Sequence, residues 1–151
     1  MEGRSDEGKA AATFSAYCIS GGLSVTEYIL PIKWADIPWK QLNAHAKGHW
    51  RAKSNATKQL RAHVAGMVIN ERFTVDAPEV RLAFYMPNAI RRDTLNMAQS
   101  MKPAIDALVD QGIIERDDWD ALTVGPMIVE IDRIRPRVVI TIVSKNTPQM
   151  G

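Results

Sequence analysis

Basic and acidic side chains lie side by side in one short stretch of the chain. Residues 91–93 are Arg-Arg-Asp, Lys102 follows, and a further acidic pair stands at Asp117 and Asp118. Carboxylate oxygens are the ligands that Mg²⁺ prefers, and Mg²⁺ commonly uses only one or two of them together with substrate phosphates. Cationic side chains beside such a site can hold a phosphate backbone in register. The residue types therefore predict a metal-dependent enzyme that acts on nucleic acid.

The overall composition is that of a soluble globular domain. The chain has 151 residues, of which 46% are hydrophobic and 24% charged. This length is enough to bury a hydrophobic core, and the composition is ordinary for a globular protein. No apolar run approaches the roughly 20 residues of a membrane helix, and the charged N-terminus is a poor signal peptide. The single cysteine, Cys18, cannot form an internal disulfide and favours a reducing compartment. We therefore expect a cytoplasmic protein with no membrane partner.

The charges are distributed unevenly, although the net charge is only +2. Residues 37–70 contain no Asp or Glu, whereas acidic residues crowd 106–120. Contact with a nucleic-acid backbone beside a metal site would explain this pattern. A solvated basic helix that precedes an acidic loop would explain it equally. The basic residues of the first stretch are Lys40, Lys47, Arg51, Lys53, Lys58 and Arg61.

Hydrophobic periodicity predicts an α+β domain. Alternating or β-branched runs predict strands near residues 25–32, 79–86, 126–132 and 137–144, and helical spacing predicts a helix over 53–71. A second helix is expected between Asp93 and Gly112, kinked or divided at Pro103. The order β-α-β-α-β-β favours a small mixed sheet of about four strands with two helices on one face. Residues 1–22 are expected to form a weakly ordered leader, 23–146 the domain and 147–151 a tail.

Two sequence blocks carry a resemblance to a known family. Residues 91–96 are Arg-Arg-Asp-x-x-Asn, and residues 101–114 are Met-Lys-Pro-x-x-Asp-Ala-Leu-Val-Asp-x-Gly-Ile-Ile, followed by Asp117 and Asp118. This order resembles the RusA family of Holliday-junction resolvases, over residues 28 to about 143. The resemblance implies a homodimeric, Mg²⁺-dependent endonuclease of a bacterial or phage-infected cell, which resolves four-way DNA junctions by paired nicks during recombination and repair.

The resemblance also assigns roles to individual residues. Asp93 matches the first catalytic aspartate and Asp118 the last, with Asp117 beside it, and these three are the expected metal ligands. Lys102 is the best candidate for the catalytic lysine. The residues expected to contact DNA are Arg91, Arg92, Asn96, Lys47, Arg51 and Lys53.

The chain departs from the family at Leu95. The best-known members have Asp-x-Asp-Asn, whereas this chain has Asp93-Thr94-Leu95-Asn96, and leucine cannot bind Mg²⁺. Two carboxylates with Asn96 and water could complete the site, or Asp117 or Asp120 could compensate. Alternatively, activity is lost and the chain is a non-cleaving protein that binds branched DNA.

Ordinary structural roles also fit the same residues. Asp93 could cap the second helix, since Asp is favoured at that position. Lys102 and Asp106 are four residues apart and could form a simple surface pair on that helix. Asp117 and Asp118 could belong to a plain acidic loop. Sequence alone does not separate these alternatives from the catalytic one.

Overall fold

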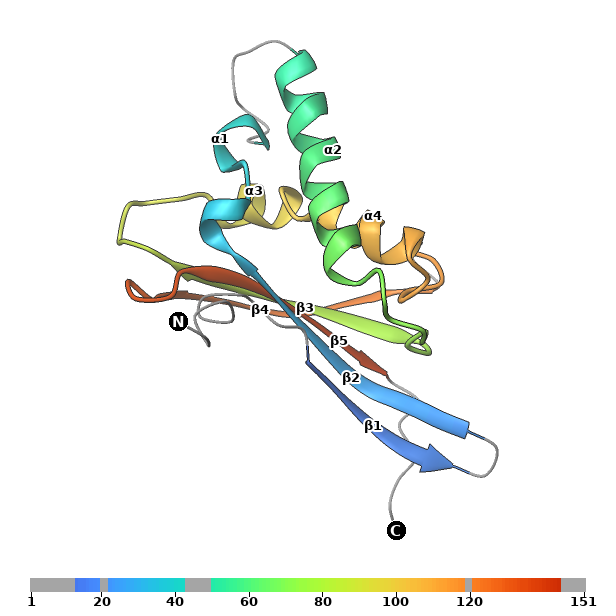
Figure 1. Cartoon of the computed structure of the whole chain (residues 1–151). Coiled ribbons are helices and arrows are strands. Elements are labelled where there is room, and N and C mark those ends of the chain that lie inside the picture. The colour runs from blue at the N-terminus through green and yellow to red at the C-terminus, as the bar shows by residue number, and fades with distance from the viewer. Residues whose placement is uncertain (1–12, 20–21, 43–49, 119–120, 145–151) are drawn as a thin grey trace, which may run out of the picture.

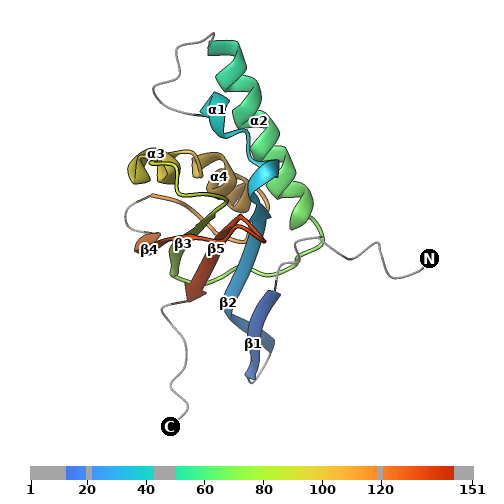
Figure 2. The ribbon, with the colours of Figure 1, turned by 90° about the vertical axis from the view of Figure 1, so that its left-hand side faces the viewer.

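One mixed sheet with helices on one face forms the fold (Figure 1). The computed structural model describes residues 13–19, 22–42, 50–118 and 121–144. The strand order is β1-β2-β5-β3-β4, and only the β3–β4 pair is parallel. Figure 2 shows the helices as a layer on one side of the sheet. The predicted α+β class is confirmed, and so is the placement of the helices on a single face.

The predicted strands and the first helix are confirmed to within a few residues. No described helix is long and apolar enough to cross a membrane. The strands are β1 (Thr13–Ile19), β2 (Gly22–Lys33), β3 (Pro78–Met86), β4 (Thr123–Ile131) and β5 (Arg137–Ser144). The helices are η1 (Trp34–Asp36), α1 (Trp39–Leu42), α2 (Trp50–Met67), α3 (Thr94–Gln99) and α4 (Lys102–Asp110).

Strand β1 corrects the prediction for the N-terminal residues. Residues 13–19 belong to an antiparallel pair with β2 rather than to a weakly ordered leader. The sheet therefore has five strands instead of about four. β1 carries a bulge between Ser15 and Ala16, so its pattern does not alternate regularly along its length. Its backbone hydrogen bonds come from pairing with β2, which no local propensity reveals.

The core lies between the sheet and the helices. On β5, Val138, Ile140 and Ile142 are buried at every second position, as expected for one face of a strand. The register places Ile140 between Leu30 of β2 and Leu82 of β3, so neighbouring strands present their apolar residues to the same side. The helices complete this layer with a further set of buried residues. Those of α2 and α4 are Ala56, Leu60, Val64, Pro103, Ala104, Ala107 and Leu108.

The predicted second helix consists of two helices. α3 ends at Gln99, and α4 begins at Lys102 with Pro103 in its first turn. A proline is harmless there, because the first N–H groups of a helix have no intrahelical acceptor. Pro103 therefore begins a new helix instead of bending an old one. Gly112, with φ of 81°, follows the end of α4 in the left-handed conformation that glycine adopts at low cost.

Replacing a core residue of α2 should lower stability much more than replacing an exposed one. Leu60 is fully buried and Lys58, on the same helix, is exposed. Leu60→Ala should reduce the free energy of unfolding by about 2–5 kcal/mol, because a cavity replaces lost apolar contacts. Lys58→Ala should change it by no more than about 0.5 kcal/mol. Urea denaturation followed by circular dichroism measures both, and equal losses would contradict the described burial.

Candidate functional site

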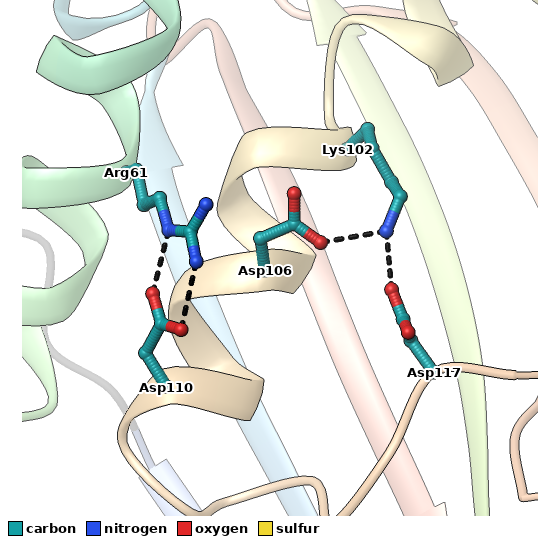
Figure 3. A network of polar contacts seen from close by, with 5 residues as sticks. All are labelled: Arg61, Lys102, Asp106, Asp110 and Asp117. Atoms are coloured by element: carbon teal, nitrogen blue, oxygen red, sulfur yellow. Dashed lines mark hydrogen bonds and ion pairs between the residues drawn. The ribbon is translucent and has the colours of Figure 1, made fainter.

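A lysine held between two carboxylates is the main polar cluster of the α3–α4 region (Figure 3). Lys102 is the first residue of α4, and its Nζ lies 2.6 Å from Oδ1 of Asp106, one turn along the helix. The same Nζ also donates to Oδ2 of Asp117, in the segment that follows α4. The Lys102 side chain remains 59% exposed. The cluster therefore combines one cation and two anions on an accessible surface.

Mutual stabilisation shifts the titration of this cluster. The hydrogen bonds to Asp106 and then Asp117 raise the pKa of Lys102. The hydrogen bond from Lys102 in turn lowers the pKa of Asp117. Because the carboxylate pKa moves down and the ammonium pKa moves up, Lys102 and Asp117 are both ionised at neutral pH.

A second ion pair fixes the helix that carries this cluster. Arg61 of α2 donates from Nε and Nη2 to the two carboxylate oxygens of Asp110 on α4, at 2.6 and 2.8 Å (Figure 3). Bidentate geometry defines orientation as well as distance. The Arg61 side chain, expected to face solvent or DNA, instead joins α2 to α4. The basic helix and the Lys102 cluster are therefore held in one arrangement.

Asp93 caps helix α3. Its Oδ1 accepts hydrogen bonds from the backbone N–H groups of Leu95, at 2.9 Å, and Asn96, at 3.2 Å. Its backbone is extended, as an N-cap residue requires. Asp93 therefore has the helix-capping role that its sequence position allows. Both capping hydrogen bonds go to Oδ1, and Oδ2 accepts neither of them.

The crossover between two parallel strands separates Asp93 from the later acidic pair along the chain. Asp93 follows the end of β3, whereas Asp117 and Asp118 precede the start of β4. The two strands are parallel and their starts pair with each other, so the end of β3 and the start of β4 lie at opposite ends of the pair. Asp118 forms an ion pair with Arg116 at 3.2 Å. Within the described residues, no group of three or more His, Cys, Asp or Glu could hold a metal ion. The structure gathers Asp106 and Asp117 around Lys102 and gives Asp93 a separate role as a cap.

Arg92 is engaged by its own loop. Its guanidinium donates to the carbonyl of Ile90 at 2.9 Å and to Oδ1 of Asn88 at 2.8 Å. It also lies over the ring of Trp34, 5.4 Å from the centroid. These contacts hold the segment between β3 and α3 against η1. Arg92 therefore positions the approach to Asp93, whereas its neighbour Arg91 is exposed.

The other residues predicted to contact DNA lie on different elements. Asn96 is half-buried in the first turn of α3, and Arg51 and Lys53 are exposed near the start of α2. Leu95, the departure from the family pattern, is 69% exposed on α3. Lys47 falls outside the described residues, as does Asp120.

Sequence reasoning missed two contributors to this region. The spacing of Lys102 and Asp106 indicates a surface pair and does not place Asp106 in the site, yet Oδ1 of Asp106 accepts a hydrogen bond from Nζ of Lys102 at 2.6 Å. The pair of Arg61 and Asp110 joins residues far apart in sequence, and no pattern in the sequence indicates it. Scans against protein-family models and curated proteins find no match for this chain, so the resemblance to the RusA family remains a prediction.

Removing the lysine should raise the pKa of Asp117. In Lys102→Met the carboxylate loses its donor, so its pKa should rise toward the ordinary value of 3.8. A lowered pKa stabilises the fold above the unfolded value, and this contribution is lost as the pH falls through the folded pKa. The stability difference between the variant and the parent should therefore shrink in acid. Carboxyl ¹³C NMR titration measures the pKa, with Lys58→Met as control, and an unchanged Asp117 titration would contradict the contact.

Proposed function

We propose that this chain is a Mg²⁺-dependent endonuclease that cuts four-way DNA junctions. The observation that carries the proposal is the exposed Lys102 cluster, built on the crossover that also carries the sequence blocks resembling the RusA family. An ionised lysine oriented by two carboxylates can stabilise the negative charge that develops on a phosphodiester during cleavage. Its neighbours Asp117 and Asp118 supply ligands of the type that Mg²⁺ prefers.

The basic face of α2 supports contact with a nucleic-acid backbone. The helix runs from Trp50 to Met67 without an acidic residue, and Arg51, Lys53 and Lys58 on it are exposed. Phosphate contacts from such residues supply affinity without sequence preference. Because Arg61 and Asp110 join α2 to α4, a duplex arm bound along α2 would have a defined position relative to Lys102.

The residues of the chain divide the work of the proposed reaction. Arg91 and the exposed cations of α2 bind phosphates, and Arg92 holds the loop that presents Arg91 and Asp93. Asp106 orients Lys102, whose ammonium lies beside the phosphate and stabilises the pentacovalent state. Asp117 and Asp118 would hold Mg²⁺, whereas Asp93 caps α3 after the opposite end of the β3–β4 pair. The bound ion would polarise the phosphate and lower the pKa of a coordinated water.

Removing either the lysine or the last aspartate should abolish cleavage. We expect the parent protein to nick a synthetic four-way junction in Mg²⁺, and Lys102→Met and Asp118→Asn each to reduce the rate by at least about 10²-fold, as for other groups that stabilise transition-state charge. Glu115→Gln, an exposed acid of the same segment, serves as the control and should retain activity. The proposal would be contradicted if the junction stays intact in Mg²⁺ or Mn²⁺ when enough parent protein is present to bind all of it.

A second candidate is a protein that binds branched DNA without cutting it. It is favoured by the exposed Leu95, at a position where the resemblance implies an aspartate, and by the capping role of Asp93. Leu95→Asp should then create cleavage in a protein that only shifts the junction in a gel, whereas Leu95→Asn should not. Nicking by the parent chain excludes this candidate.

Either candidate predicts binding that weakens as salt rises. Each lost phosphate contact reduces the slope of log affinity against log salt by about 1. Arg51→Ala and Lys53→Ala should therefore each flatten the slope, whereas Arg81→Ala on β3 should leave it unchanged. Fluorescence anisotropy of a labelled junction across a salt series measures this. Equal slopes for all variants would remove α2 from the DNA-binding surface.

A further inference from the structure

Two loops of the structure each expose an isoleucine beside arginine. In the loop after β3, Ile90 is 65% exposed and precedes Arg91. In the hairpin between β4 and β5, Ile134 is 90% exposed and lies between Arg133 and Arg135. Ile134 is the most exposed of the large hydrophobic residues that the structure describes. One exposed apolar side chain is ordinary, but here two occur in the same chemical setting.

The same local hydrogen bond fixes both isoleucines. The N–H of Ile90 donates to Oδ1 of Asn88 at 3.2 Å, and the N–H of Ile134 donates to Oδ1 of Asp132 at 3.1 Å. Each isoleucine therefore stands two residues after the side chain that turns its loop. Asp132 also accepts a bond from the N–H of Arg135 at 3.0 Å. The backbone donors are used within the turns, whereas the apolar side chains face solvent.

The hairpin is anchored at both of its ends. The N–H of Asp132 donates to the carbonyl of Met86, the last residue of β3, at 2.8 Å. The N–H of Trp34 donates to the carbonyl of Pro136 at 3.1 Å. Arg137 donates to Oδ2 of Asp132 at 2.9 Å and so closes the turn. A tip that is already ordered loses little conformational freedom when it binds a partner.

The two loops lie at the same end of the sheet (Figure 1). Met86, which directly precedes the first loop, pairs with Ile131, which directly precedes the hairpin. Arg92, at the far side of the first loop, lies 5.4 Å from the ring centroid of Trp34. The backbone of Trp34 in turn binds the hairpin at Pro136. The same framework therefore positions both isoleucines.

This end of the sheet is strongly basic. Residues 84–92 and 131–138 contain five arginines and one acidic residue, Asp132. The carboxylate of Asp132 is used by its own turn and by Arg137. Guanidinium groups match the geometry of phosphate oxygens and bind them through two parallel hydrogen bonds. The arginines that remain exposed here are Arg91, Arg133 and Arg135.

We propose that Ile134 and Ile90 insert between bases at the branch point of a DNA junction, while the exposed arginines beside them hold the flanking phosphates. Proteins that bend or open DNA often insert apolar side chains between base steps and contact the adjacent backbone. The arginines favour an anionic partner, and a nucleic acid places an apolar base step between two phosphates. Unstacking costs least where base stacking is already interrupted, as it is at a branch point.

This inference rests on the proposed contact with branched DNA and adds the means by which the branch point is recognised. It does not depend on cleavage, so the two proposals fail separately. A junction that is unstacked by the isoleucines and stays uncut supports the inference and contradicts the nuclease. A junction that is nicked without any unstacking by the isoleucines does the reverse.

The fluorescence of 2-aminopurine at the branch point tests the insertion directly, because its emission rises when it loses its stacked neighbours. In Ca²⁺ in place of Mg²⁺, the full-length parent at saturation should raise the emission severalfold. Ile90→Ala with Ile134→Ala should abolish this rise in junction that anisotropy shows to be fully bound. The double variant should also bind about 10-fold more weakly, the scale expected for lost apolar contacts.

Matched variants separate insertion from a change in the fold. Both substitutions lie at exposed positions, so circular dichroism should be unchanged. Ile134→Leu keeps an apolar side chain and should keep the rise in emission. Ile69→Ala, at a 57% exposed position on the turn after α2, should behave as the parent. A parent that does not bind the junction or binds it without a rise, or an equal rise in the double variant, would overturn the proposal.

The arginines should affect affinity without affecting insertion. Arg133→Gln with Arg135→Gln should reduce the slope of log affinity against log salt by about 2 and keep the rise in emission at saturation. Arg72→Gln with Arg81→Gln, an exposed pair on other elements, should leave the slope unchanged. An unchanged slope in the first pair would overturn the phosphate contacts. Ile134-dependent binding to phosphatidylserine vesicles, with junction emission independent of Ile134, would assign the surface to a membrane instead.

Discussion

The parallel pairing of β3 with β4 is the constraint on which the candidate site depends. Two adjacent parallel strands cannot be joined by a tight turn, so the chain must cross from the end of one to the start of the other. Helices α3 and α4 make this crossover. The acidic residues and the lysine of the candidate site lie on it, at the cap of α3, on the exposed side of α4 and in the segment before β4. The packing of α4 against the sheet and α2 therefore decides which of these side chains meet.

The Lys102 cluster contributes little to the stability that holds it in place. Its members are partly exposed, and solvent-exposed ion pairs are commonly worth less than about 1 kcal/mol. The buried apolar residues of α4 and the pair between Arg61 and Asp110 fix the helix independently of Lys102. The core therefore does not require the Lys102 cluster.

Local sequence patterns predicted the elements better than they predicted the contacts. Alternation in β3 and β5 and helical spacing in α2 report burial directly, and they located these elements closely. β1 was missed because its order comes from pairing with β2 across a bulge. The contact of Lys102 with Asp117 and that of Arg61 with Asp110 depend on how α4 packs. For Asp93, the sequence allows a capping role, and in the structure its side chain accepts from the backbone N–H groups of Leu95 and Asn96.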